Sequence, residues 1–204
     1  MSTLLIALGL LLLMYFMYNF VHSYSEITYV VSDVDGKTYM IRRGHNKSPK
    51  FLQDSANTLA RINSKVEQLI VHLDENFSSD PTKTYFITKL KSAYSPYMIS
   101  EAEVDPRYTT YTVDKEEMHI CLRTRDKTEN IYELNTLMYV VLHELSHLCN
   151  YTPDGYPIQG HGEEFKMIFR FLVQQSIKIG VYNYTDYTRF PINYCGITLS
   201  SQIV

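Results

Sequence analysis

The sequence contains no tryptophan and only three cysteines among its 204 residues. An odd number at this low density excludes a fold built on a disulfide framework. The usual burial of cysteine favours three buried thiols at Cys121, Cys149 and Cys195. One bridge plus one free thiol is the alternative, if the domain faces an oxidising compartment.

The chain also lacks an excess of positive charge. It has 19 lysines and arginines against 22 aspartates and glutamates, for a net charge of -3, and its basic residues are scattered. Proteins that bind nucleic acids usually carry a basic excess or a basic run. A nucleic-acid partner is therefore not expected. The length suits one domain with its own core, and there is no internal repeat or low-complexity linker.

One long stretch without charge stands at the N-terminus. Residues 4–21 read LLIALGLLLLMYFMYNFV, in which only Asn19 interrupts the apolar character. As a helix they would span about 27 Å, close to the roughly 30 Å of a bilayer core. We expect a transmembrane anchor over residues 1–23 and a separate domain over residues 24–204. A cleaved signal peptide is less favoured, because residues 1–3 hold no basic side chain. A buried core helix is also less favoured, because the domain is too small to bury a helix that is apolar all round.

The charges that flank this segment predict its orientation. No lysine or arginine precedes it, whereas Lys37, Arg42 and Arg43 follow it. The positive-inside rule then favours a cytoplasmic location for the domain over residues 24–204. The expected location is thus that of a single-pass membrane protein.

The rest of the chain mixes strand and helix patterns. Two hairpins are indicated by β-rich runs on either side of turn residues, at 26–32 with 37–43 and at 109–113 with 118–123. Helical periodicity or apolar character predicts helices over 51–73, 132–149 and 163–178. Residues 84–92 fit either a helix or a strand, and the tail from residue 187 suggests irregular chain with one short strand. The fold class expected is α+β.

The strongest chemical signal is His143-Glu144-Leu145-Ser146-His147, an H-E-x-x-H sequence. On a helix, positions i and i+4 share one face, so His143 and His147 can bind one zinc ion. Glu144 would then serve as general base toward water and afterwards as proton donor. A helix with two satisfied histidines and a surface glutamate is the alternative. The apolar flanks favour a metal, because buried polar side chains need a partner.

The third zinc ligand is predicted to be His161. It comes after a turn-rich segment and precedes the next helix, so the chain can reverse and return it to the metal. Glu163 and Glu164 are rivals, although acidic residues are also common in the first turn of any helix. Cys149 is rejected, because two residues past His147 it lies about 200° around the helix.

These motifs resemble a known group of enzymes. HELSH followed by H-G-x-x-F at residues 161–165 is similar to the SprT-like and WLM metallopeptidases. A closer likeness is to proteins of large DNA viruses assigned as metallopeptidases, and it extends through LNTLMYVVLHELSH, FRFLVQQSIKIGVYNY and DYTRFPINYCGITL. The resemblance implies a compact, zincin-like α+β core with zinc on His143, His147 and His161. The loop between His147 and His161 is longer here than in that group.

The resemblance also draws attention to Tyr194 in the Y-C-G sequence near the C-terminus. A tyrosine beside a zinc site can stabilise an oxyanion. A packed structural turn is the alternative, and we favour it.

Together these features predict a membrane-anchored zinc endopeptidase that acts on a protein or peptide substrate. From the viral likeness, the membrane could be that of a virus or virion. Two alternatives are a structural membrane or virion component that keeps a metal-bound fold without turnover, and a protease of DNA-crosslinked proteins. The acidic balance of the chain counts against the latter.

Overall fold

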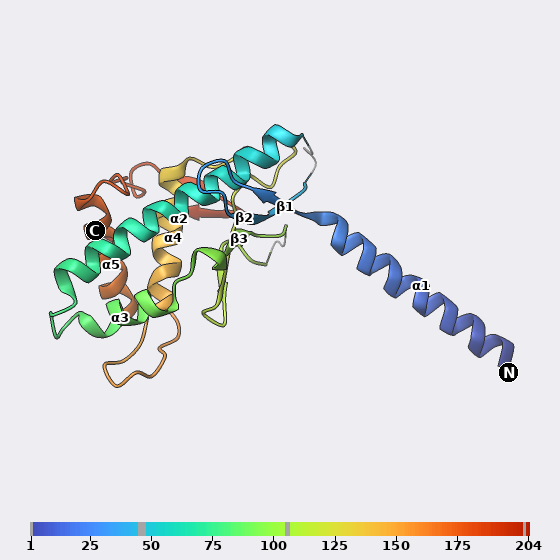
Figure 1. Ribbon diagram of the computed structural model, residues 1–204, viewed down its shortest axis with the longest axis horizontal. Helices are drawn as coiled ribbons and strands as arrows, with labels where there is room; N and C mark the ends of the chain where they lie inside the picture. The colour runs from blue at the N-terminus through green and yellow to red at the C-terminus, as the bar shows by residue number, and fades with distance from the viewer. Residues whose placement is uncertain (1, 45–47, 105–106, 202) are drawn as a thin grey trace.

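The computed structural model describes residues 2–44, 48–104, 107–201 and 203–204, and the side chains of residues 2–4 and 22–25 are not among those described. Five α-helices, one short 3-10 helix and seven strands are found in these ranges. Helix α1 (Ser2–Glu26) projects away from the other elements (Figure 1). The remaining elements pack around one apolar core.

The predicted transmembrane anchor at residues 1–23 is wrong, and so is the single-pass membrane location. Met1 lies outside the described residues. Within the part of the chain that the structure describes, no helix combines the length and the apolar character needed to cross a bilayer.

The first hairpin is confirmed and packs against a long helix. Strands β1 (Ile27–Val31) and β2 (Thr38–Arg42) pair antiparallel. Helix α2 (Pro49–Phe77) confirms the amphipathic pattern and extends it at both ends. Its start is fixed locally, because the Ser48 side chain accepts a hydrogen bond from the backbone N–H of Phe51 and proline occupies the first turn.

The middle of the chain forms a small mixed sheet. Residues 84–92, whose sequence fitted either a helix or a strand, are helical in α3 (Thr84–Ala93). The 3-10 helix η1 (Pro96–Met98) comes next. Strands β4 (Tyr111–Val113) and β5 (Glu117–Ile120) confirm the second hairpin. Strand β3 (Ile99–Glu101) was not predicted and pairs parallel with β5.

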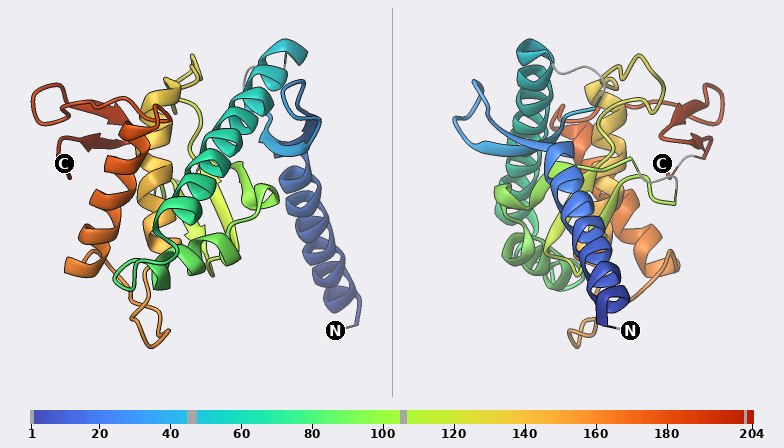
Figure 2. Two further views of the ribbon diagram at one scale, coloured as in Figure 1. Left: turned by 60° about the vertical axis from the view of Figure 1, so that its left-hand side comes forward. Right: turned by 90° about the vertical axis from the view of Figure 1, so that its right-hand side faces the viewer.

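Helices α4 (Leu134–Leu148) and α5 (Glu163–Lys178) confirm the last two predicted helices. They pack side by side, with α2 on the other flank of α4 (Figure 2). Most side chains of α4 are buried, so this helix forms the centre of the fold.

The C-terminal tail is more regular than predicted. Strands β6 (Ile192–Tyr194) and β7 (Ile197–Leu199) form a hairpin rather than one isolated strand. Its two-residue turn is Cys195-Gly196, with φ angles of 49° and 88°, the left-handed conformation that tight hairpin turns require. A disulfide joins Cys195 to Cys121, while Cys149 is free and buried. The favoured expectation of three buried thiols is therefore wrong.

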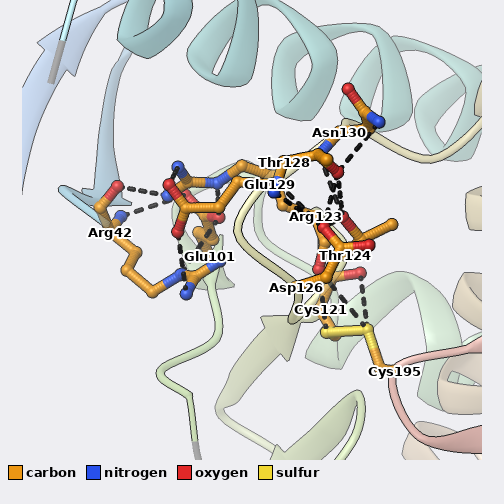
Figure 3. Close-up of polar contacts among 10 residues, drawn as sticks. All are labelled: Arg42, Glu101, Cys121, Arg123, Thr124, Asp126, Thr128, Glu129, Asn130 and Cys195. Carbon is orange, nitrogen blue, oxygen red and sulfur yellow. Dashed lines mark hydrogen bonds and ion pairs between the residues drawn. A yellow bond between two sulfur atoms is a disulfide. The ribbon is translucent and has the colours of Figure 1, made fainter. Parts of the chain in front are cut away.

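A buried cluster of two arginines and two glutamates ties the β1–β2 hairpin to the sheet of β3, β4 and β5 (Figure 3). Arg123 is fully buried and donates hydrogen bonds to Glu101 and to the backbone carbonyl of Arg42. The Arg42 side chain lies 3.4 Å from Glu129 and 3.7 Å from Glu101. The charges balance, which is the condition under which buried ions are tolerated.

Replacing Arg123 with methionine is expected to lower the free energy of unfolding by about 3–5 kcal/mol, because two buried carboxylates would then share one arginine. Chemical denaturation measures the change. Lys91→Gln is the matched control, since the Lys91–Asp74 pair is largely exposed and should cost no more than about 1 kcal/mol. Equal losses in the two variants would contradict this account of the cluster.

Removing the disulfide with Cys121→Ser and Cys195→Ser together is expected to cost up to about 4 kcal/mol of stability. The bridge joins residues 74 apart, and a loop of this length loses that much chain entropy on closure. Urea unfolding with and without reductant provides the measurement. Reductant should destabilise the natural chain and leave the double variant unchanged, and no effect on either would count against the bridge.

Candidate metal centre

Two of the predicted ligands lie on one face of the central helix. His143 and His147 are one turn apart on α4 and are partly exposed, whereas Leu142, Leu145 and Leu148 on the other faces are fully buried. The packing of these leucines fixes the rotation of the helix. Both imidazoles consequently face away from the core, toward the segment that carries His161.

The segment between the two helices returns His161 to α4. Asn150, fully buried at the end of α4, accepts a hydrogen bond from the N–H of Ile158 and donates one to its carbonyl. This pair closes the base of the intervening loop, so residues 151–157 form an excursion that does not displace the chain after Ile158. His161 follows this closed base after three residues.

The Nε2 atoms of His143, His147 and His161 converge on one point. The distance from His143 to His147 is 3.2 Å, and His161 lies 3.0 Å from each of them. Zinc–nitrogen bonds of about 2.0–2.1 Å in a tetrahedral arrangement separate the nitrogens by about 3.3 Å. The three side chains thus fit the ligand spacing of one such ion without a change of fold.

Hydrogen bonding alone cannot satisfy this triangle. A neutral imidazole nitrogen either carries a proton and donates or has a lone pair and accepts, and it cannot do both. Among three mutually close nitrogens, at least one pair must therefore bring two donors or two acceptors together. A shared cation relieves this conflict, because all three lone pairs can point at it.

The surroundings keep two of these imidazoles neutral. Burial, followed by repulsion from the neighbouring imidazoles, lowers the pKa of His143 to about 3. Burial, then His161 and Lys115, lowers the pKa of His147 to about 4. At neutral pH both rings are uncharged, which is the form that binds metals.

Phe165 is the packing platform under the histidines. Its ring centroid lies 4.3 Å from that of His147, 4.7 Å from His161 and 4.9 Å from His143. It is buried in the first turn of α5. The H-G-x-x-F spacing therefore has a structural reason, since the phenylalanine four residues after His161 fixes the tilt of all three rings.

Glu144 is buried next to the cluster and held by a neighbouring strand. The Thr112 hydroxyl in β4 donates a hydrogen bond of 3.0 Å to Oε2 of Glu144. Burial raises the pKa of the Glu144 carboxyl to about 7, and the Thr112 bond opposes that rise. Thr112 was not singled out from the sequence, because a contact between residues 32 apart leaves no local pattern.

A lysine closes the C-terminal end of α4. The Lys115 ammonium donates to the carbonyls of His147 at 2.9 Å and Asn150 at 3.3 Å. A cation at this end of a helix also interacts favourably with the helix dipole. Asp114 and Lys115 both have positive φ angles, 49° and 61°. Such backbone strain persists where surrounding contacts hold it, and here the contact is with the helix of the two histidines.

The alternative ligands point elsewhere. Glu163 forms an exposed ion pair with Lys166, and Glu164 accepts a hydrogen bond from Tyr85. Cys149 is fully buried and bonds to the carbonyl of Leu145. Tyr194 is fully buried too, and its hydroxyl donates to the carbonyl of Cys121. Tyr194 nevertheless lines the same cleft as the histidines, so its role stays a prediction.

The cluster opens into a cleft of about 650 Å³. Its floor is α4, and its walls come from β4, from the chain around His161 and from the C-terminal hairpin. Besides the histidines and Glu144, the lining includes Asp114, Lys115, Tyr139, Val140, Ile197 and Leu199. Across the described residues, no fourth histidine, cysteine, aspartate or glutamate joins the three histidines.

His161→Ala is expected to lower zinc affinity at least tenfold, because two imidazoles would remain of three. Elemental analysis of the purified full-length chain and competition with a chromogenic chelator measure this. His72→Ala is the matched control, since His72 lies on α2 and bonds to Gln175. The three-histidine site would be refuted by a His161→Ala protein that still binds one zinc as tightly as the natural chain.

Comparison with known proteins finds relatives among large DNA viruses. An uncharacterized protein of Acanthamoeba polyphaga mimivirus is 34% identical over 181 residues, covering 88% of this chain and 86% of that protein. An uncharacterized protein of Invertebrate iridescent virus 6 is 27% identical over 116 residues, which are 56% of this chain and 60% of the viral protein. An uncharacterized protein of Invertebrate iridescent virus 3 is 38% identical over 90 residues, which are 43% of this chain and 50% of that viral protein.

No protein-family model matches the chain, and no solved structure matches it. The likeness to SprT-like and WLM enzymes therefore stays a prediction. The mimivirus relative shares about a third of its residues with this chain and is matched over most of both chains. The chain belongs to the same protein family as this mimivirus protein.

Proposed function

We propose that this protein is a zinc-dependent peptidase that hydrolyses peptide bonds in its central cleft. The observation that carries the proposal is the convergence of three imidazole nitrogens within 3.0–3.2 Å, next to a buried glutamate. Other transition metals also bind imidazole. Zinc is preferred because three histidines with one open position are the usual ligand set of hydrolytic zinc sites.

Each residue has a separate role in this proposal. His143, His147 and His161 would hold the metal, which when bound supplies Lewis-acid chemistry that activates water and polarises a carbonyl group. Glu144 would take the proton from the attacking water and pass it to the nitrogen of the leaving amine. The hydrogen bond from Thr112 keeps the Glu144 carboxylate in one orientation during both transfers.

The open cleft supports a catalytic rather than a purely structural metal. A structural zinc site is normally closed by four protein ligands, whereas a hydrolytic site keeps a position free. Three ligands come together among the described residues, and His161 is exposed at the cleft. A substrate can therefore approach the metal position from solvent.

The charges of the cleft favour a peptide over a nucleic acid-linked substrate. Lys115 is the one lysine among the lining residues, which include no arginine, and its ammonium is bound to carbonyls of α4. Asp114 beside it is acidic. A DNA backbone would require several free cations, so cleavage of DNA-crosslinked proteins has less support.

Glu144→Gln is expected to reduce the rate of peptide hydrolysis by about 10²–10⁴-fold, because an amide cannot accept the proton from water. Zinc content should stay that of the natural chain, since Glu144 is not a ligand. Mass spectrometry of a digested peptide library measures cleavage. Glu163→Gln is the matched control, because it makes the same change at an exposed residue that bonds to Lys166.

Two results would contradict the proposal. The first is a Glu144→Gln protein that cleaves as fast as the natural chain, which would mean that the activity arises elsewhere. The second is a zinc-loaded natural chain that cleaves no peptide in the library, which would favour a structural component that keeps its metal without turnover.

A further inference from the structure

The cleft has two chemically different ends along α4. Tyr139 and Val140 lie one turn before His143 on the same face of the helix, and both line the cleft. At the other end, Lys115 bonds to the last carbonyls of the helix. A substrate lying along α4 would meet an apolar surface on one side of the histidines and a polar surface on the other.

The C-terminal hairpin adds to the apolar end. Ile197 and Leu199 on β7 are two residues apart, so they face the same side of the strand, and both line the cleft. The hydroxyl of Tyr139 donates to the carbonyl of Ser201, 3.4 Å away, just past the strand. This contact places the end of β7 over the first half of α4. Ile197 is 46% exposed and so has surface left to cover.

The hairpin is fastened at its turn. The disulfide joins Cys195 to Cys121, and the Cys195 N–H donates to the hydroxyl of Tyr132 at 2.9 Å. The adjacent Tyr194 hydroxyl is 2.6 Å from that of Thr110 and 2.9 Å from the carbonyl of Cys121. These contacts fix the turn against the chain around β4 and β5, and Figure 3 shows the bridge between Cys195 and Cys121.

We propose that the β6–β7 hairpin is the specificity wall of the cleft, and that it selects substrates with a large apolar side chain next to the bond that is cleaved. Ile197 and Leu199 from the hairpin and Tyr139 and Val140 from α4 form the subsite. This inference rests on the proposed peptidase function. A leucine, isoleucine or phenylalanine there would bury apolar area that Ile197 now exposes to water.

An acidic side chain in the same subsite would be disfavoured. It would lose hydration, and the cleft lysine that could pair with it, Lys115, is held at the other end of α4. A charged group moved from water to an apolar site without a partner is strongly penalised. The subsite should therefore discriminate against glutamate more sharply than against alanine.

Binding to full-length, zinc-loaded Glu144→Gln protein tests the subsite without turnover. The probes are two fluorescent peptides of alanine and glycine that differ in one central residue, leucine or glutamate, and anisotropy measures their affinities. The leucine peptide is expected to bind at least roughly tenfold more tightly. Ile197→Lys in the same background should reverse the order, because an ammonium group would then pair with the glutamate.

Phe190→Lys in that background is the matched control. Phe190 is exposed just before β6 and is not among the residues that line the cleft, so the preference for leucine should persist. Three results would overturn the proposal. They are equal affinities for the two peptides, no binding of either peptide, and a reversed preference in the Phe190→Lys protein. A natural chain that binds with this preference but does not cleave would instead count against the peptidase function alone.

Discussion

The approach of three imidazole nitrogens to about 3 Å of one another is the constraint on which the rest of the site depends. Such an arrangement is unfavourable without a shared positive partner, because imidazole nitrogens cannot satisfy three mutual contacts by hydrogen bonds. The chain nevertheless holds them there with α4, the closed loop after it and Phe165. The surrounding packing thus holds three ligand nitrogens at the spacing that one shared cation would require.

Burial has opposite effects on the two kinds of side chain at this centre. It lowers the pKa of His143 and His147 and raises that of Glu144. In each case the uncharged form is favoured, because the low-dielectric surroundings disfavour charge of either sign. A bound cation would shift that balance for the carboxylate. A metal at the histidines and the Glu144 carboxyl would therefore be coupled through the environment that they share.

Local sequence patterns were sufficient to predict most helices and both early hairpins, and they also identified the three histidines that meet. Periodicity and motif spacing are properties of neighbouring residues, so the sequence shows them directly. Strand β3, the Thr112–Glu144 bond and the Cys121–Cys195 bridge all join distant residues. Nothing in the local pattern indicates such partners. The anchor was predicted from apolar character, and no helix of the described residues combines that character with the length needed to cross a bilayer.

The disulfide imposes an order on assembly. Cys195 comes after every helix that the structure describes, so the bridge to Cys121 can close only when those helices have been synthesised. His143, His147 and His161 all precede Cys195 in the chain. The covalent attachment of the hairpin is therefore made after these helices, and it requires a thiol oxidant. Oxidation thus sets the time at which one wall of the cleft becomes covalently fixed.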